Sequence, residues 1–120
     1  MCAWRAAGGG DATLLVLVVE DEQRVARVIL TILERAGHRV SLAGALREAA
    51  PALSRSAFDV VIADFILPDG DGLAFARQAR SEHGAGAIVM SGLADIPDSD
   101  GLIALAKPFT PCLLYTSDAA

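Results

Sequence analysis

Four short apolar runs of this sequence are each followed at once by side chains that could take part in phosphoryl chemistry. These side chains belong to Glu20, Asp21, Asp64, Ser91 and Lys107. Brought together, three carboxylates would repel one another unless a cation lay between them, and carboxylate oxygens with room for water suit Mg²⁺. An ammonium and a hydroxyl beside them would bind phosphoryl oxygens while one carboxylate attacks in line. The residue types therefore indicate magnesium-assisted phosphoryl transfer to an aspartate.

Each of these residues also has a structural interpretation when it is taken alone. An acidic pair after a strand is often the first turn of a helix, where carboxylates interact favourably with the helix dipole. A single Asp in such a place is more often a turn or capping residue, and a single Ser is nearly always structural. The functional interpretation depends on the joint position of these residues after successive apolar runs.

The apolar runs themselves predict the elements that position these side chains. The first run is short, continuous and rich in β-branched residues, as expected for a strand buried on both faces of a parallel sheet, and the others are also predicted to be short strands. The runs cover residues 14–19, 58–63, 87–90 and 103–106, and a weaker strand is expected at 39–42.

Helical patterns and a turn separate these strands, at residues 25–33, 45–53 and 73–82 for the helices and 68–72 for the turn. Gly37 is placed to end the first helix, and Pro51 would kink or end the second. Strands that alternate with helices imply right-handed βαβ units and a doubly wound α/β domain. In such a sheet, ligands bind outside the carboxyl ends of the strands, which is where the polar residues fall.

The composition limits the class of protein. With 120 residues, 53% of them hydrophobic and 21% charged, the chain has room for one compact domain with a buried core. The formal net charge of −5 and the lack of a basic run argue against direct contact with nucleic acid. The longest apolar run has six residues, far fewer than the roughly 20 that a membrane-spanning helix needs. We therefore expect a cytoplasmic domain without membrane contact, preceded by a flexible lead-in at residues 1–13.

Four segments resemble the receiver domain of two-component response regulators, of the chemotaxis-regulator type. They are Val16–Glu22, Asp59–Leu73, Val89–Gly92 and Ala106–Phe109, and they follow one another in the order of the family's motifs. The resemblance covers residues 14–111. It implies a flavodoxin-like, five-stranded parallel sheet with strand order 2-1-3-4-5.

The resemblance implies a magnesium site. Carried over residue by residue, it makes Asp21 a direct ligand of Mg²⁺ and Glu20 a ligand either directly or through water. Asp64 and the backbone carbonyl of Ile66 would complete the protein ligands. Mg²⁺ is the cofactor that the resemblance predicts.

The resemblance also makes Asp64 the phosphoacceptor. Ser91 would donate a hydrogen bond to the phosphoryl group, and Lys107 would pair with it. An added phosphoryl group carries about −1.5 to −2 charges, so both side chains would be drawn inward, which is how the family signals. The phosphoryl group would come from a sensor histidine kinase or a phosphotransfer protein.

Three features depart from the family's pattern. The family usually has an aromatic switch residue three positions before the lysine, where this chain has Ala104. Only 15 residues separate the serine from the lysine, so we expect the fourth helix to be reduced. Ile66 and Leu93 flank the acceptor and cannot orient a hydrolytic water, so we expect a long-lived phosphoaspartate.

The end of the sequence also differs from the family, which has its fifth helix there. Thr110 and Pro111 would start a helix, but residues 112–120 lack helical periodicity. These residues can be encoded by TGTCTCTTATACACATCTGACGCTGCC, which resembles a transposon-based sequencing adapter read in frame. We therefore expect a receiver domain truncated before its fifth helix, with residues 112–120 as a non-native, adapter-derived tail.

Three functions are compatible with these residues. A phosphoacceptor domain, the leading interpretation, would be a stand-alone regulator, the front of a larger regulator with an output domain, or a receiver of a hybrid kinase. A Mg²⁺-dependent aspartyl phosphohydrolase would need a second acid two residues after the nucleophile, where this chain has Ile66. A pseudo-receiver that binds partners without phosphorylation is favoured by Ala104 but disfavoured by the complete acceptor pocket.

Overall fold

The structure, a computed structural model, describes residues 13–91 and 103–106. These residues form a parallel sheet with three helices packed against it. The strands run side by side in the order β2-β1-β3-β6-β7, and neighbouring strands are parallel. The strand bounds are β1 Leu15–Val19, β2 Arg39–Ala43, β3 Val60–Asp64, β6 Gly86–Ser91 and β7 Ile103–Ala106. The helix bounds are α2 Gln23–Arg35, α3 Leu46–Arg55 and α4 Gly72–His83.

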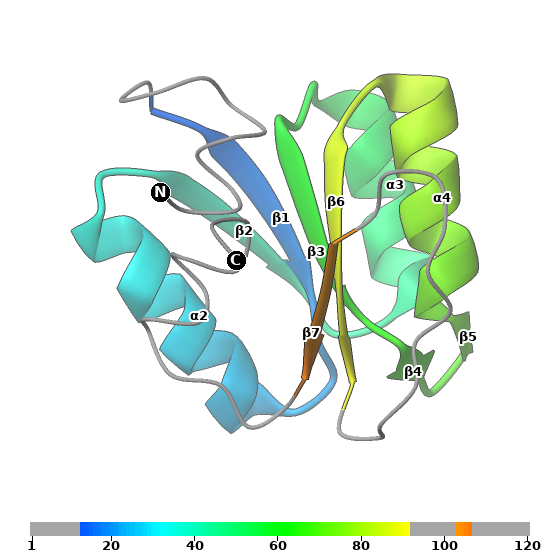
Figure 1. Cartoon of the computed structure of the whole chain (residues 1–120), viewed down its shortest axis with the longest axis horizontal. Helices are drawn as coiled ribbons and strands as arrows, with labels where there is room; N and C mark the ends of the chain where they lie inside the picture. Colours follow the sequence, from blue (N-terminus) through cyan, green and yellow to red (C-terminus); the bar gives the residue numbers. More distant parts are fainter. Residues whose placement is uncertain (1–12, 92–102, 107–120) are drawn as a thin grey trace.

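The sheet lies between two helical layers (Figure 1). Helix α2 covers one face, and α3 and α4 cover the other. In β1, Val16 and Val18 belong to the buried cluster that includes Leu33 of α2, whereas Leu17 and Val19 belong to the cluster beneath α3 and α4. Because successive side chains of a strand point to opposite faces, a continuous apolar run is what a strand covered on both sides requires. The expected doubly wound α/β architecture is confirmed.

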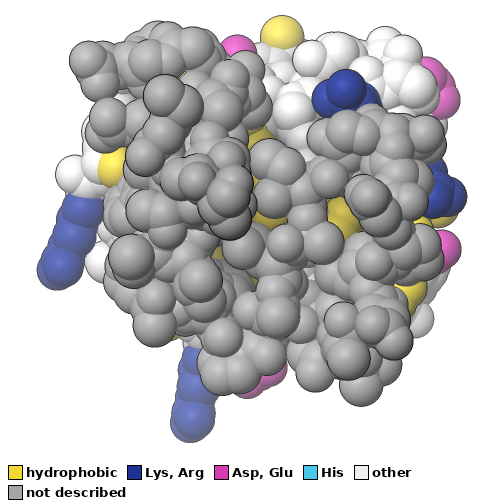
Figure 2. All heavy atoms as spheres, in the orientation of Figure 1, with side chains coloured by type: hydrophobic (Ala, Val, Ile, Leu, Met, Phe, Trp, Pro, Cys, Tyr) yellow, Lys and Arg dark blue, Asp and Glu magenta, His cyan; other side chains and the backbone are white. Residues whose placement is uncertain are grey.

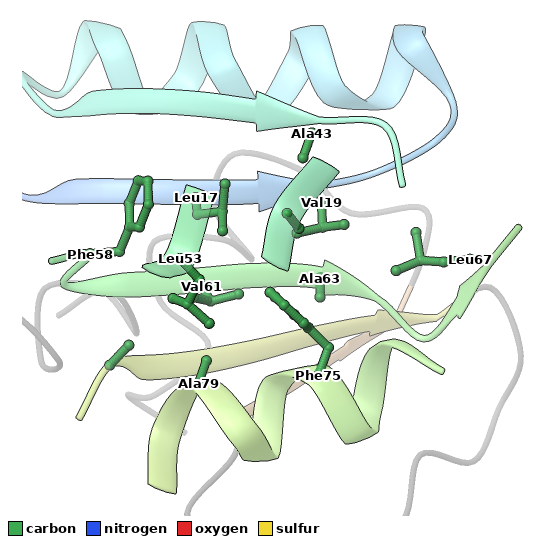
Figure 3. Packing of buried hydrophobic residues seen from close by; sticks show 12 residues of the cluster. Leu17, Val19, Ala43, Leu53, Phe58, Val61, Ala63, Leu67, Phe75 and Ala79 are labelled. Carbon is green, nitrogen blue, oxygen red and sulfur yellow. The ribbon is translucent and has the colours of Figure 1, made fainter. Parts of the chain in front are cut away.

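Figure 3 shows the cluster between the sheet and the layer of α3 and α4. Phe75 and Ala79 of α4 lie toward the sheet, where β3 contributes Val61 and Ala63, and Leu53 comes from α3. All five are buried. Burial of a large apolar side chain such as Phe75 contributes about 1.5–3 kcal/mol, so this layer holds the carboxyl end of β3 firmly.

Helix α2 confirms the helix expected from the periodic apolar residues. Its buried residues are Ala26, Ile29, Ile32 and Leu33, which occupy one side of the helix. The helix is followed by Gly37, whose φ of +93° lies in the left-handed region. Glycine adopts this conformation without the steric cost that other residues incur, so Gly37 ends the helix as predicted.

Pro51 is expected either to kink or to end the second helix. The expectation that it ends the helix is wrong. Helix α3 continues through Pro51 to Arg55. A proline inside a helix removes one backbone hydrogen bond and crowds the preceding turn. Here Pro51 is exposed, while Ala49 and Leu53 are buried against the sheet. Burial of that side of the helix outweighs the local cost of the proline.

The segment expected as a simple turn at residues 68–72 is more ordered than the sequence pattern predicts. Ile66–Leu67 (β4) and Gly70–Asp71 (β5) pair as a two-stranded antiparallel hairpin. The carboxylate of Asp71 then caps α4 by accepting a hydrogen bond from the backbone N–H of Leu73 at 2.8 Å. The residues between β3 and α4 therefore form a small folded unit of their own.

The expected strand order is confirmed from β2 to β6, and β7 pairs with β6 at the edge where the fifth strand is expected. The reduced fourth helix, the missing fifth helix and the adapter-derived tail concern residues 92–102 and 107–120, which lie outside the described residues, as does nearly all of the lead-in. No helix within residues 13–91 and 103–106 is long and apolar enough to cross a membrane.

Candidate functional site

The acidic residues predicted from the sequence lie together at the carboxyl ends of β1 and β3. These strands are neighbours in the sheet, with Val19 opposite Ala63, so the residues that follow them reach the same edge. Carboxylate oxygens of Glu20, Asp21 and Asp64 all lie within 4.8 Å of one another. The predicted acidic cluster is therefore present.

The three carboxylates differ in their exposure to solvent. Glu20 is only 3% exposed, Asp64 is partly buried, and Asp21 is exposed. The backbone N–H of Glu20 donates a hydrogen bond to the carbonyl of Ala43 at 3.0 Å. This bond extends the pairing of β1 with β2 by one residue and holds Glu20 inside the fold. The cluster is thus anchored by Glu20 and open to water at Asp21.

Charge repulsion favours a cation at this cluster. Three carboxylates within 4.8 Å form three pairs of like charges, which repel one another, least where the exposed Asp21 is screened by water. A divalent cation offsets this repulsion. Mg²⁺ binds one or two carboxylates and keeps several waters, which fits a donor set of oxygens with one exposed side. The residues present therefore suit Mg²⁺.

The chain is held tightly just after Asp64. The backbone N–H of Phe65 donates to the carbonyl of Met90 in β6 at 2.7 Å, and the carbonyl of Phe65 accepts from the N–H of Gly72 at 2.9 Å. Ile66 follows directly, as the first residue of β4, and its side chain is 60% exposed. The residue predicted to offer its carbonyl to the metal thus belongs to a closed hairpin at the acidic edge.

Of the serine and the lysine predicted for the site, the structure describes the backbone of Ser91 but not Lys107. Ser91 is the last residue of β6 and stands one position beyond Met90, the register partner of Asp64. The backbone of Ser91 therefore reaches the same edge of the sheet as the acidic cluster. Its own register partner in β7 is Ala106. Lys107 is the next residue in the sequence and lies outside the described residues.

A surface depression of about 380 Å³ opens beside the acidic cluster. It lies between the amino end of α2 and the residues that join β2 to α3. Its lining includes the charged residues Glu20, Asp21, Arg27 and Glu48. Because Glu20 and Asp21 belong to both the depression and the cluster, a small solute can approach the carboxylates from this side.

Figure 2 shows charged side chains of the described residues around the edge of one face of the molecule. The basic side chains visible among the described residues, all of them arginines, lie singly near the rim, and acidic side chains lie between them. The arginine side chains visible in this view are separated from one another and do not form a stripe of the kind that binds a nucleic-acid backbone.

Asp69, which the sequence pattern predicts only as a turn residue, binds the amino end of α3. Its Oδ1 accepts a hydrogen bond from the backbone N–H of Leu46 at 2.8 Å, and its Oδ2 accepts one from Arg47 at 2.9 Å. These two bonds lower the pKa of Asp69 from its usual 3.8. The N-cap position of α3 is Ala45, which has no side-chain acceptor. An alanine at the N-cap position is the sequence signal that the first N–H groups of this helix need an acceptor from elsewhere in the chain.

Residues 16–114 match the family model described as "Response regulator receiver domain". Among curated proteins, the chain is 39% identical over 102 residues to the KDP operon transcriptional regulatory protein KdpE of Escherichia coli, covering 78% of this chain and 44% of that protein. It is 36% identical over 78 residues to the transcriptional activator protein PfeR of Pseudomonas aeruginosa, covering 65% of this chain and 26% of that protein. The chain spans less than half the length of these two relatives.

Solved structures show the same fold. The chemotaxis response regulator CheY4 of Vibrio cholerae matches with a TM-score of 0.75 and 26% identity, covering 86% of this chain and 93% of that chain. The receiver domain from the hybrid histidine kinase CckA matches with a TM-score of 0.73 and 31% identity, covering 83% of this chain and 91% of that chain. Both similarities cover more than four fifths of this chain.

Proposed function

This chain belongs to the response regulator receiver domain family, and on that premise we propose that Asp64 accepts a phosphoryl group from a histidine kinase or a phosphotransfer protein. A receiver domain is a signalling module of two-component systems and not a classical enzyme. The observation that supports Asp64 as the acceptor is the acidic cluster, in which carboxylate oxygens of Glu20, Asp21 and Asp64 lie within 4.8 Å.

The proposed metal site consists of oxygen ligands from three segments of the chain. Asp21 and Asp64 bind Mg²⁺ directly, Glu20 binds it directly or through water, and Ile66 offers its backbone carbonyl. When bound, Mg²⁺ neutralises charge on the phosphoryl oxygens as they approach the acidic cluster. The exposure of Asp21 supports this assignment because it leaves room for the waters that Mg²⁺ retains.

The proposed transfer is a single displacement at phosphorus. A carboxylate oxygen of Asp64 forms a bond to phosphorus while the bond from phosphorus to the imidazole nitrogen of the donor histidine breaks. The products are an acyl phosphate on Asp64 and a free histidine on the donor. Lys107 pairs with the added negative charge, and the hydroxyl of Ser91 donates a hydrogen bond to a phosphoryl oxygen. The position of the Ser91 backbone at the acidic edge supports this role.

Intact mass measurement tests the proposal. The protein is incubated with Mg²⁺ and a small acyl-phosphate donor, as wild type and as Asp64→Asn. The matched control is Asp59→Asn, the same substitution at the residue just before β3, whose last residue is Asp64. We expect one phosphoryl adduct in the wild type and in Asp59→Asn, and none in Asp64→Asn.

This experiment, together with an assay of phosphate monoester turnover by the same protein, separates the alternatives. An absence of adduct in every variant overturns the proposal in favour of a pseudo-receiver. Continuous turnover of phosphate monoesters overturns it in favour of a phosphohydrolase, although Ile66 stands where that class needs its second acid. Failure of the adduct to form when Mg²⁺ is chelated before the donor is added supports the metal assignment.

The route from phosphorylation to output is also proposed to differ from the family's usual one. Ala104, paired with Val89 at the sheet edge, stands at the aromatic switch position and has no ring to move.

Residues 92–102 between β6 and β7 include Pro97 and three Asp residues, which supports a reduced fourth helix. The two curated relatives, a transcriptional regulatory protein and a transcriptional activator, favour an output domain that acts on transcription, whereas the similarity to the CckA receiver favours a hybrid kinase. Sequencing the source DNA past codon 111 decides between these arrangements.

A further inference from the structure

The carboxylate of Asp69 connects the β4–β5 hairpin, which follows Asp64, to helix α3 by two hydrogen bonds. We call this pair of hydrogen bonds the tie. Asp69 stands at the tip of the hairpin, between β4 and β5, and its two oxygens accept hydrogen bonds from the first two backbone N–H groups of α3, at 2.8 Å from Leu46 and 2.9 Å from Arg47. These N–H groups have no partner within the helix itself. The tie therefore supplies α3 with the cap that Ala45 lacks.

A close contact accompanies the tie. A Cβ built on Gly70 would lie 2.6 Å from Cδ1 of Leu46, so the hairpin backbone lies directly against the first residue of α3. Leu67 of β4, which pairs with Gly70 across the hairpin, is only 5% exposed and belongs to the cluster beneath α3 and α4. The hairpin and the amino end of α3 are thus packed together as well as hydrogen-bonded.

The other end of the hairpin is fixed to the acidic edge. Ile66 pairs with Asp71, and the N–H of Gly72 closes the loop on the carbonyl of Phe65 at 2.9 Å. Gly72 lies so near Asp64 that no side chain fits between them. A displacement of the hairpin tip is therefore transmitted to the backbone that carries the proposed phosphoacceptor and the carbonyl of Ile66.

We infer that Asp69 is a positioning residue that couples the magnesium site to the amino end of α3. The inference rests on the proposed function, in which the carbonyl of Ile66 is a metal ligand. Held by Asp69 at its tip, the hairpin presents that carbonyl in one place. By thermodynamic linkage, a metal that fixes the hairpin must in turn strengthen the bonds from Asp69 to Leu46 and Arg47.

Amide hydrogen exchange without metal tests the tie itself. In Asp69→Ala, we expect faster exchange at Leu46 and Arg47, and also at Gly72, whose N–H closes the hairpin. The matched control is Asp59→Ala, which removes a carboxylate that accepts from the N–H of Leu15 at 2.8 Å at the opposite end of the sheet. Asp59→Ala should speed exchange at Leu15 and leave the other three amides unchanged.

Mg²⁺ titration tests the coupling. In the wild type, we expect Mg²⁺ to slow exchange at Leu46 and Arg47, and in Asp69→Ala this slowing should vanish. The Kd for Mg²⁺, measured by calorimetry, should rise by about fivefold in Asp69→Ala, the lower end of typical coupling between sites. It should be unchanged in Asp59→Ala, which reports the effect of lost stability alone.

A conservative variant separates the hydrogen bonds from the charge. Asp69→Asn removes the same charge as Asp69→Ala but keeps one oxygen acceptor, so its Kd should lie between those of the wild type and Asp69→Ala. Equal Kd values in the two variants would show that only the charge matters and overturn the inference. So would an unchanged Kd in Asp69→Ala, and in that case the proposed function stands. If the wild type binds no Mg²⁺, the proposed metal site and the coupling to it both fail, and the metal-free exchange rates still report whether Asp69 ties the hairpin to α3.

Discussion

Gly72 packs against the backbone of Asp64 so closely that a Cβ built on Gly72 would lie 1.7 Å from the carbonyl oxygen of Asp64. Real atoms cannot approach to that distance, and the obstacle is backbone, which cannot rotate away as a side chain can. The chain leaves β3 at Asp64 and returns at Gly72 to begin α4. The absence of a side chain at this position is therefore what allows the hairpin to close beside the acidic cluster.

Replacement of Gly72 by alanine should destabilise the fold strongly. Because the added methyl group meets backbone, the hairpin must shift, and we expect a loss of about 3 kcal/mol in the free energy of unfolding. Urea unfolding measures this loss. Gly44→Ala is the matched control, since its Cβ would meet only the carboxylate of Glu48 at 3.6 Å, an ordinary contact. Equal losses in the two variants would contradict the steric explanation.

Replacement of Ile66 by asparagine should shorten the lifetime of the phosphoaspartate. Ile66 is 60% exposed and stands two residues after Asp64, so its side chain can be changed at little cost in stability. Asparagine offers a donor and an acceptor that can orient a hydrolytic water, which isoleucine cannot do. We expect at least a severalfold faster loss of the adduct in intact mass measurements with Mg²⁺. Val28→Asn, at an exposed apolar residue of α2, should leave the lifetime unchanged, and a similar change there would count against the prediction.

Replacement of His38 by alanine should destabilise the amino end of the sheet. His38 is 7% exposed, and its Nδ1 accepts a hydrogen bond from the backbone N–H of Leu14 at 2.9 Å. Without the imidazole, this buried N–H loses its acceptor, which costs about 1–3 kcal/mol. Urea unfolding checks the loss against His83→Ala, an exposed histidine whose removal should change the free energy of unfolding by no more than about 0.5 kcal/mol.

The contribution of Asp69 to stability should depend on pH in one direction. Hydrogen bonds from Leu46 and Arg47 hold the pKa of Asp69 below 3.8 in the folded protein. A group whose pKa is lower in the folded than in the unfolded state stabilises the fold above its unfolded pKa, and this stabilisation is lost as the pH falls through the folded value. The difference in unfolding free energy between wild type and Asp69→Ala should therefore be largest at neutral pH and shrink below pH 3.8.

Urea unfolding of both proteins across this range measures the difference. Asp69→Asn, which cannot ionise, serves as the control and should show no such change relative to Asp69→Ala. A difference between wild type and Asp69→Ala that stays constant down to the most acidic samples would show that the carboxylate form of Asp69 is not what α3 binds.

Much of the fold could be predicted because its signals are local. The run 14–19 is apolar on every residue, as expected for a strand covered on both faces, and it is too short and too rich in β-branched residues for a typical helix. The periodicity of α2 and the glycine that follows it are likewise contained in about four turns of chain. Pro51 shows the limit of local signals, since its helix continues because Ala49 and Leu53 are buried against the sheet.

The acidic cluster could also be predicted, because position along the sequence is enough to place it. Glu20 and Asp21 end one buried strand and Asp64 ends another, and parallel strands bring their carboxyl ends to one edge. Ser91 follows the same rule as far as its backbone is described. The sequence by itself thus determined the family, the sheet and the three acidic residues that meet at the site.

Only the tertiary structure decided how the site is supported. Asp69 bonds to residues 22 and 23 positions away, and the N–H of Leu14 finds its acceptor 24 positions away in His38. Neither interaction produces a repeating pattern in the sequence, because a single hydrogen bond constrains only the two residues that it joins. The close approach of Gly72 to Asp64 is of the same kind. Such contacts depend on where packed elements place two distant backbones, which hydrophobic periodicity alone does not specify.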